Sequence, residues 1–283
     1  MKLSVIIVNY NVTQLLDNCL GSVVKFFQGI SYEIIVVDNC SPDQSWKNLI
    51  DKYPHAKFIA SETNDGFAVA NNRGVSNASG EYILLLNPDT EIEGFYIKNI
   101  LDFADNIHNF GSLGIRMHDA HGKFLPESKR SVPDIFNSFE KLFTGIRKNN
   151  SKSYYRNDLK ENVIAEVEIL TGAFLLVKKS VYEEVGGLDE RYFMYGEDID
   201  LCYSILQRNY SNWYYGKASM LHHKVESTVK NKLYLSRFYG AMEIFVEKYY
   251  RKKTPFQFYI LLAGLKVRHQ LEKMKLQKER RFK

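Results

Sequence analysis

The stretch that decides the fold is Glu81-Tyr82-Ile83-Leu84-Leu85-Leu86-Asn87-Pro88-Asp89-Thr90-Glu91. Its apolar run has the length of a strand and ends at Pro88, which has no N–H to give to a sheet, so the backbone leaves the sheet where Asn87 and Asp89 lie. In an open α/β sheet, ligands bind beyond the carboxyl ends of the strands. A carboxylate held there can coordinate a hard divalent cation that bridges substrate phosphates. The alternative interpretation is a turn in which Asn87 and Asp89 only cap the next helix.

Upstream of this stretch, apolar segments alternate with helical patterns. Residues 3–8 and 32–37 are rich in β-branched and apolar side chains, as buried parallel strands are, and residues 56–60 form a shorter third segment. Between the first two strands, apolar residues recur at helical spacing over 15–27. The alternating order predicts an α/β fold with a right-handed, mostly parallel sheet.

Downstream of residue 92, strand-like and helix-like patterns continue without an internal repeat. The expected helices cover 95–107, 180–186, 231–250 and 255–278, and the expected strands cover 163–170, 173–177 and 213–221. A further helix starts near Glu197, because apolar residues recur on one face over 199–206. Glu197 and Asp198 then lie in its first turn, where the helix dipole favours carboxylates.

The charge of the chain is unevenly distributed. The 283 residues carry a net charge of +5, and with 19 Tyr and 18 Phe most of the chain is expected to fold. Residues 251–283 hold eleven Lys or Arg against two Glu, a local net charge of +9, which leaves −4 for residues 1–250. A nucleic-acid-binding domain usually spreads its basic residues over one face of the fold, so we expect no nucleic-acid partner.

The sequence gives no sign of a membrane span or a disulfide framework. No apolar run reaches the roughly 18 residues that cross a bilayer, and Leu3–Val8 is shorter than a secretory core of about 7 to 15 residues. We therefore expect a cytoplasmic protein. Cys19, Cys40 and Cys202 are odd in number and far apart, which fits reduced thiols.

Five ordered motifs carry a resemblance to a known family. They are Val5-Ile6-Ile7-Val8-Asn9-Tyr10-Asn11, Val36-Val37-Asp38-Asn39-Cys40-Ser41-Pro42-Asp43, Gly66-Phe67-Ala68 with Asn71-Asn72-Arg73-Gly74, Asn87-Pro88-Asp89, and Gly187-Leu188-Asp189-Glu190 with Glu197-Asp198-Ile199-Asp200-Leu201-Cys202. The ordered set, over about residues 3–227, resembles the family 2 glycosyltransferases and is most similar to their rhamnosyltransferase-like branch.

The resemblance implies a GT-A fold, a nucleotide-sugar donor, a divalent metal and inversion at the anomeric carbon. It also implies a domain division. A GT-A domain would cover residues 1–230, with a nucleotide-binding half over about 1–92 and an acceptor half over about 93–230. Residues 231–283 lie beyond the matched stretch, and their own sequence pattern predicts basic amphipathic C-terminal helices.

The resemblance assigns the donor to residues beyond the strand ends. Asp38 matches the carboxylate that hydrogen-bonds the base or ribose, and Asn9 and Tyr10 match positions that line the nucleoside pocket. The other donor-binding candidates are Asn39, Asn72, Arg73 and Asn87. The alternative for Asp38 is a turn-capping role before Ser41. For Arg73, and likewise for Lys129 and Arg130, the alternative to a phosphate contact is a solvated surface charge.

The metal candidates are Asp89 and His222. Asp89 matches the last position of the family's Asp-x-Asp signature, and Asn87 replaces its first acid, so we expect Mg²⁺ or Mn²⁺ to bridge Asp89 and the donor diphosphate. His222 stands where relatives carry a His several residues before a Ser, here Ser227. The usual intervening glycines are Lys224 and Val225 in this chain, which leaves open whether His222 or His223 reaches the metal.

The catalytic candidates are Asp198 and Glu197. Asp198 aligns with the second residue of the Glu-Asp pair that serves the family as catalytic base, and the reaction needs a base because the acceptor hydroxyl loses its proton as it attacks. We expect the neighbouring Glu197 and partial burial to raise the pKa of this carboxylate. The alternative is that both acids only cap the helix. We further expect Asp89 and Asp198 to face each other across one cleft.

The predicted activity is an inverting, metal-dependent hexosyl transfer from a nucleotide-sugar donor. dTDP-rhamnose and UDP-sugars are the donor candidates, and the acceptor is a growing surface polysaccharide or a lipid-linked oligosaccharide. The alternative is a catalytically silent partner that binds a sugar nucleotide or glycan. A sugar nucleotidyltransferase and a dinucleotide-binding oxidoreductase are disfavoured, because residues 9–14 contain no glycine.

The basic tail suggests contact with a membrane surface on the inner face of the cytoplasmic membrane. Apolar residues lie close to its Lys and Arg residues, a composition suited to a membrane interface with anionic lipid. They are Phe256, Phe258, Tyr259, Leu261, Leu262, Leu265 and Val267. The alternative is packing against the catalytic core or a second subunit; the oligomeric state stays open.

Overall fold

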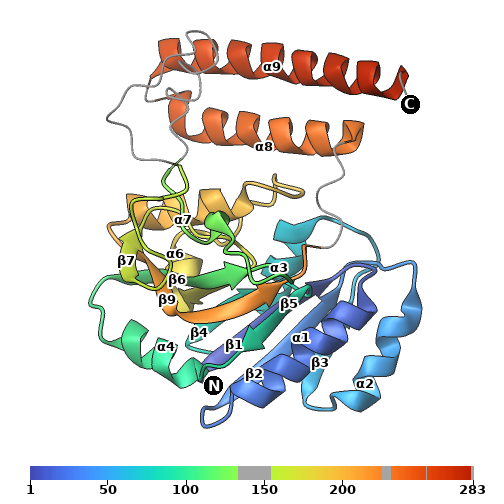
Figure 1. Ribbon diagram of the computed structural model, residues 1–283, viewed down its shortest axis with the longest axis vertical. Helices are drawn as coiled ribbons and strands as arrows, with labels where there is room; N and C mark the ends of the chain where they lie inside the picture. The colour runs from blue at the N-terminus through green and yellow to red at the C-terminus, as the bar shows by residue number, and fades with distance from the viewer. Residues whose placement is uncertain (133–153, 225–230, 253, 282–283) are drawn as a thin grey trace.

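The computed structural model describes residues 1–132, 154–224, 231–252 and 254–281 (Figure 1). These residues form one nine-stranded sheet with the order β3-β2-β1-β4-β8-β6-β9-β5, and β7 pairs with β9 off this path. The strands are β1 (Leu3–Asn9), β2 (Tyr32–Asp38), β3 (Ala56–Ala60), β4 (Tyr82–Leu86), β5 (Thr90–Glu93), β6 (Phe110–His118), β7 (Ile164–Val167), β8 (Phe174–Lys178) and β9 (Ser211–His222).

The first four strands are parallel, as the sequence predicts. The chain moves outward from β1 to β3 and then returns to the other side of β1 as β4. This reversal creates a topological switch point between β1 and β4, which is where ligands bind in open α/β sheets. Asn9 and Asp38 are register partners at the carboxyl ends of β1 and β2, and Asn87 follows β4 at the same edge.

The second part of the sheet contains pairings that the sequence analysis did not anticipate. β8 joins both β4 and β6 antiparallel, β6 and β9 are parallel, and β5 and β7 each pair antiparallel with β9. β6 was not predicted as a strand because Gly111 and Gly114 weaken its strand signal. Both glycines are required by packing: a Cβ at Gly114 would lie 2.9 Å from Leu170 Cδ2, and one at Gly111 would collide with Ile205.

Helices cover both faces of the sheet. They are α1 (Thr13–Phe26), η1 (Gln44–Lys47), α2 (Asn48–Lys52), α3 (Phe67–Ser76), α4 (Ile97–Asp105), η2 (Pro126–Ser128), α6 (Lys179–Glu184), α7 (Glu197–Gln207), α8 (Lys232–Tyr250) and α9 (Pro255–Arg281). Alternation along β1 sends Val5 and Ile7 into a core with α1 and α4, and Ile6 and Val8 into a core with α3, α6 and α7. The helices predicted over 95–107, 180–186, 231–250 and 255–278 are confirmed.

The two C-terminal helices stack on the core as successive layers (Figure 1). α8 packs against α7, where Tyr203 stacks edge-on with Tyr249 and Lys248 forms an ion pair with Asp200. α9 packs against α8 through a third apolar cluster. Part of the apolar content of the tail is therefore explained by packing, the alternative that the sequence left open. Among the described residues, no helix has the combined length and hydropathy to cross a bilayer.

Two further predictions bear on the whole chain. Cys19, Cys40 and Cys202 are free thiols, as expected. The sheet continues from β1–β4 into the strands that follow residue 93, and the predicted division into a nucleotide-binding and an acceptor half near residue 92 stays a prediction.

Candidate active site

Beyond β1 and β2, Asp38 holds a buried polar cluster together. Its Oδ1 accepts hydrogen bonds from Asn9 Nδ2 at 2.7 Å and from Ser41 Oγ at 2.5 Å, and its Oδ2 accepts from the Ser41 amide at 2.9 Å. Asp38 thus caps the turn at Ser41, the alternative considered above, and it is only 2% exposed. Its contact with a donor stays a prediction.

Asn9 and Asn39 offer acceptors beside this cluster. Asn39 Nδ2 donates to Asn64 Oδ1 at 2.9 Å, while the Oδ1 atoms of Asn9 and Asn39 are buried without a partner among the described residues. A buried polar atom without a partner is costly and often marks a ligand contact. Tyr10 is 48% exposed next to them, so its ring is open for stacking. These features fit a pocket for a base or ribose.

Asn72 and Arg73, expected to contact the donor, bind other parts of the protein. Asn72 Nδ2 donates to Leu188 O at 2.8 Å and its Oδ1 accepts from Tyr182 Oη at 2.6 Å, so Asn72 ties α3 to the turn at 187–190. Arg73 contacts Ser61 Oγ and lies 3.3 Å from Asp65 Oδ2. Their donor roles stay predictions, and the tether gives Asn72 a structural role that the sequence analysis missed.

Gly66 joins the start of α3 to the segment before α7. Its φ of 94° favours glycine, and a Cβ there would lie 2.5 Å from Phe193 O. The next amide, of Phe67, donates to the same oxygen at 2.7 Å. The motif beginning at Gly66 is therefore in direct contact with Phe193, which lies between Glu190 and Glu197, although about 130 residues separate them.

Asp89 and His222 lie side by side because β5 pairs with β9 in a register that places Thr90 opposite His222. His222 Nε2 is 3.4 Å from Asp89 Oδ1, whereas His223 Nε2 is 2.7 Å from Glu91 Oε1. Of the two histidines, His222 is thus the one whose side chain lies beside the Asp89 carboxylate, whereas His223 donates only its backbone amide to Asp89 O. Ser227, the other half of this motif, lies outside the described residues.

The donor set around Asp89 fits a divalent cation bound mainly through substrate. Asp89 supplies a carboxylate, His222 an imidazole, and Asn87 an Oδ1 atom that is buried without a partner among the described residues. Within the same described ranges, no group of three or more His, Cys, Asp or Glu side chains is placed to hold a metal alone. Mg²⁺ sites with one or two protein carboxylates, substrate phosphates and waters follow this pattern.

Asp198, like Asp38, accepts three hydrogen bonds. Its Oδ1 accepts from the Ile199 amide at 2.8 Å, and its Oδ2 accepts from the Gly172 amide at 3.2 Å and from Arg130 Nη2 at 2.6 Å. The Asp198 side chain keeps 14% of its surface exposed. Asp198 therefore accepts from an amide in the first turn of its own helix, whose N-cap is Gly196, and remains accessible as well.

Arg130 and Lys129 are buried, so the interpretation of both as solvated surface charges is wrong, and a phosphate contact stays a prediction. Arg130 is buried, donates to Tyr154 Oη at 3.3 Å and to Leu170 O, and pairs with Asp198. Lys129 is buried too and donates to a backbone carbonyl, that of Arg156, at 2.8 Å. Burial lowers the pKa of Lys129.

Glu197 is a buried acid without a cation of its own. Its Oε2 has no partner among the described residues, and burial, followed by the charge of Asp198, raises the pKa of Glu197 to about 8. The sequence analysis expected burial and like charge to act on Asp198. In the structure Asp198 pairs with Arg130, and the raised pKa is that of Glu197.

One short segment joins the metal candidates to the base candidate. The Asn87 amide donates to Ala173 O at 3.0 Å, and the next residue back, Gly172, donates its amide to Asp198. Asn87, two residues before Asp89, and Asp198 thus both bind the backbone of Gly172–Ala173, the segment that leads into β8. Asp89 and Asp198 lie at the same edge of the sheet, and the width of a cleft between them stays a prediction.

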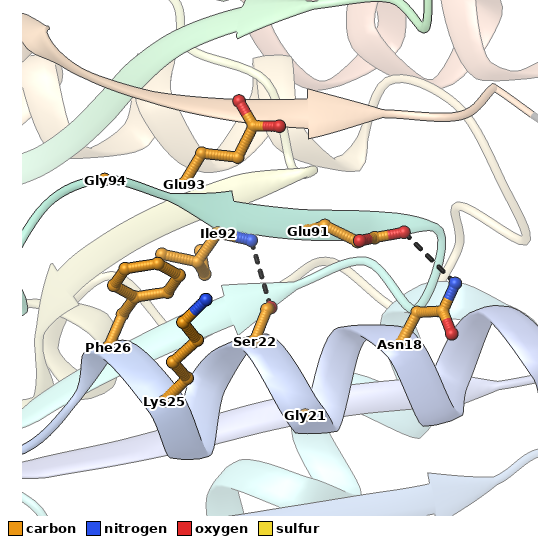
Figure 2. A pocket seen from close by; sticks show the side chains of 9 residues that line it. All are labelled: Asn18, Gly21, Ser22, Lys25, Phe26, Glu91, Ile92, Glu93 and Gly94. Atoms are coloured by element: carbon orange, nitrogen blue, oxygen red, sulfur yellow. Dashed lines mark hydrogen bonds between the residues drawn. The ribbon is translucent and has the colours of Figure 1, made fainter.

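A separate groove lies between α1 and β5 (Figure 2). It encloses about 480 Å³, and Asn18 Nδ2 donates to Glu91 Oε1 at 3.1 Å along its wall. Its lining residues are Asn18, Gly21, Ser22, Lys25, Phe26, Glu91, Ile92, Glu93 and Gly94. None of the candidate site residues lines it, and it meets the site only through Glu91, which pairs with His223.

Solved structures define the class of the fold. The chain is similar to GalNAc-T7 with UDP, GalNAc and Mn²⁺, with a TM-score of 0.65 and 15% identity over 92% of this chain and 50% of that chain. It is also similar to Staphylococcus aureus TarS 1–349 in complex with UDP-GlcNAc, with a TM-score of 0.61 and 20% identity over 95% and 72% of the two chains. The fold is that of the GT-A glycosyltransferases, as predicted.

The family follows from the sequence comparisons. The model of glycosyl transferase family 2 matches residues 4–186, and the chain belongs to this family. It is 30% identical over 208 residues, 69% of this chain and 67% of the relative, to the N-acetylglucosaminyl-diphospho-decaprenol L-rhamnosyltransferase of Mycobacterium tuberculosis. It is 28% identical over 180 residues, 60% and 65% of the two chains, to the rhamnosyltransferase WbbL of Escherichia coli. The protein is a glycosyltransferase that uses a nucleotide-sugar, which confirms the resemblance.

Proposed function

We propose that this protein is an inverting, metal-dependent hexosyltransferase that extends a surface polysaccharide or a lipid-linked glycan. The observation that carries the proposal is the shared contact segment before β8. Through it, Asp198 and the turn that holds Asn87 and Asp89 lie together at the switch-point edge of the sheet. A base and a diphosphate-binding acid are the two parts that glycosyl transfer from a nucleotide-sugar requires.

The donor would bind across the carboxyl ends of β1, β2 and β4. Tyr10 is positioned to stack on the base, and Asn9 and Asn39 present unpaired oxygens to base or ribose hydrogen-bond donors. The diphosphate would lie toward Asp89 and His222, which would hold Mg²⁺ or Mn²⁺ together with Asn87. When bound, the cation would stabilise the negative charge that develops on the leaving nucleoside diphosphate.

Asp198 would act as the general base. The acceptor hydroxyl attacks the anomeric carbon opposite the diphosphate, the bond to the diphosphate breaks, and the hydroxyl proton passes to Asp198. The three N–H donors on Asp198, from Ile199, Gly172 and Arg130, fix its carboxylate in one orientation. Inversion follows from this single in-line displacement.

The acceptor and the location are further parts of the proposal. The Mycobacterium tuberculosis relative is named for a diphospho-decaprenol acceptor, which supports a lipid-linked glycan here. dTDP-rhamnose is the first donor to test, and UDP-GlcNAc, which is bound in the TarS structure, is the second. With a lipid-linked acceptor, the protein would work at the inner face of the cytoplasmic membrane, and residues 251–283 would make peripheral contact.

Donor binding and donor turnover test the proposal separately. A thermal-shift screen of nucleoside diphosphates and nucleotide-sugars with and without Mn²⁺ identifies the ligand, because a ligand of the folded state raises stability by mass action. Donor hydrolysis by wild type should be lost in Asp198→Asn while donor binding is kept. Asp102→Asn, which changes an exposed carboxylate paired with Lys98, is the matched control and should behave as wild type. Donor binding without turnover by wild type on any acceptor would favour the silent binding partner instead.

A further inference from the structure

α9 carries two apolar faces, only one of which is covered. The covered face presents Phe258, Leu261 and Leu265 to α8, and all three are buried. Other large apolar side chains of α9 are between 37% and 79% exposed. They are Phe256, Tyr259, Ile260, Val267, Leu271 and Met274, and we call them the outward stripe.

The outward stripe is continuous along the helix. At about 100° per residue, steps of four, seven, four and three residues from Phe256 through Ile260, Val267 and Leu271 to Met274 return to one side of the helix. The same rotation puts Phe258 and Leu265 on the opposite side, against α8. Because both sides are apolar, four of the seven apolar tail residues singled out in the sequence analysis pack inside the protein, and the other three, Phe256, Tyr259 and Val267, are exposed.

Basic residues border the stripe. The helical rotation places Lys266 on one flank of the stripe and Lys275 on the other, and both are exposed. The tail from residue 251 onward has a net charge of +9. α9 is also the outermost layer, with α8 between it and the catalytic core (Figure 1). The stripe therefore faces away from the rest of the protein.

These observations select one occupant. A second copy of this chain meeting the stripe would bring two tails of +9 together, which like-charge repulsion opposes. An anionic lipid surface offers an apolar layer for the stripe and negative head groups for the flanking Lys side chains. We propose that the outward stripe of α9 lies in the interface of an anionic bilayer, with α9 parallel to the membrane plane. The inference specifies which face makes the membrane contact proposed above.

Vesicle co-sedimentation of the full chain tests the assignment. Wild type is expected to bind phosphatidylcholine vesicles that contain phosphatidylglycerol and to bind pure phosphatidylcholine vesicles at least tenfold less. The variant Phe256→Ser/Val267→Ser/Leu271→Ser should lower the partition coefficient for anionic vesicles tenfold or more. The matched control is Val24→Ser/Ile50→Ser, which changes similarly exposed apolar residues on α1 and α2 and should bind as wild type.

Two further measurements keep the outcomes distinct. Thermal unfolding of the stripe variant should match wild type, because its three residues are exposed, and donor hydrolysis in solution should be unchanged. If the proposed enzymatic function is wrong, wild type will show no donor hydrolysis, and its vesicle binding will be unaffected. Vesicle binding that is equal in wild type and the stripe variant overturns the inference. So does a shift from dimer to monomer in the stripe variant by sedimentation velocity without loss of vesicle binding, because a second copy would then be the occupant.

Discussion

Breaking the Arg130–Asp198 ion pair should destabilise the protein strongly. Arg130 Nη2 and Asp198 Oδ2 are 2.6 Å apart, and the two side chains are only 10% and 14% exposed. Removing one partner of a buried pair leaves the other charge uncompensated and typically costs about 3–5 kcal/mol. We therefore expect Arg130→Met to lower the free energy of unfolding by about 3–5 kcal/mol. Asp198→Asn should cost less, because Arg130 keeps Tyr154 and Leu170 as acceptors.

The double variant isolates the pair itself. Arg130→Met/Asp198→Asn removes both charges, so the sum of the single effects should exceed the double effect by about 1–3 kcal/mol. Urea denaturation followed by tryptophan fluorescence measures each free energy. Arg251→Met is the matched control, since its pair with Glu247 is well exposed on both sides and should be worth at most about 1 kcal/mol. Single effects that add to within about 0.5 kcal/mol would refute the coupling.

Three other predictions follow from the site. The pKa of Glu197 is about 8 in the folded state and 4.5 in the unfolded chain, so between these pH values the folded state binds more protons. Wild type should therefore lose stability as pH rises from 4.5 toward 8, by at most about 1.4 kcal/mol per pH unit. Urea titrations at several pH values should show a flatter profile for Glu197→Gln, and an equal slope would contradict the assignment. Asp89→Asn should weaken Mn²⁺-dependent binding of the nucleoside diphosphate by about 10–100-fold in calorimetry and leave metal-free binding unchanged. Gly66→Ala should destabilise the protein more than Gly122→Ala does. At Gly122 only the positive φ opposes alanine, at a cost of about 1–2 kcal/mol, whereas a Cβ at Gly66 would also meet the backbone oxygen of Phe193. Equal denaturation midpoints for the two variants would argue against this contact.

The first half of the sheet is predictable because its signals are local. β1, β2 and β4 are mainly apolar, buried runs, β-branched in β1 and β2 and leucine-rich in β4, and helices lie between them along the chain. Such runs read as parallel strands without any tertiary information. The polar residues at the ends of these strands, Asn9, Asp38 and Asn87, then lie at one edge of the sheet because the strands are parallel. The position of the candidate site is therefore available from the sequence.

The partners of the site residues are not available in the same way. Arg130 and Asp198 are 68 positions apart, and the identity of a residue as arginine does not indicate whether its side chain is buried. Asn72 reaches Leu188 across 116 positions, and its motif suggests ligand binding equally well. The strand β6 was missed because close packing against Leu170 and Ile205 explains its glycines, and strand propensity does not. In each case the deciding interaction is long-range.

The acid pair at the start of α7 shows how burial changes the meaning of a motif. On an exposed helix, Glu197 and Asp198 would both be ionised and both would interact favourably with the helix N-terminus. In this fold the pair is enclosed, and the nearby Arg130 forms an ion pair with only one of them. Two negative charges beside a single cation are too costly in such a place, so one acid keeps its proton. Arg130 pairs with Asp198, and the raised pKa falls on Glu197.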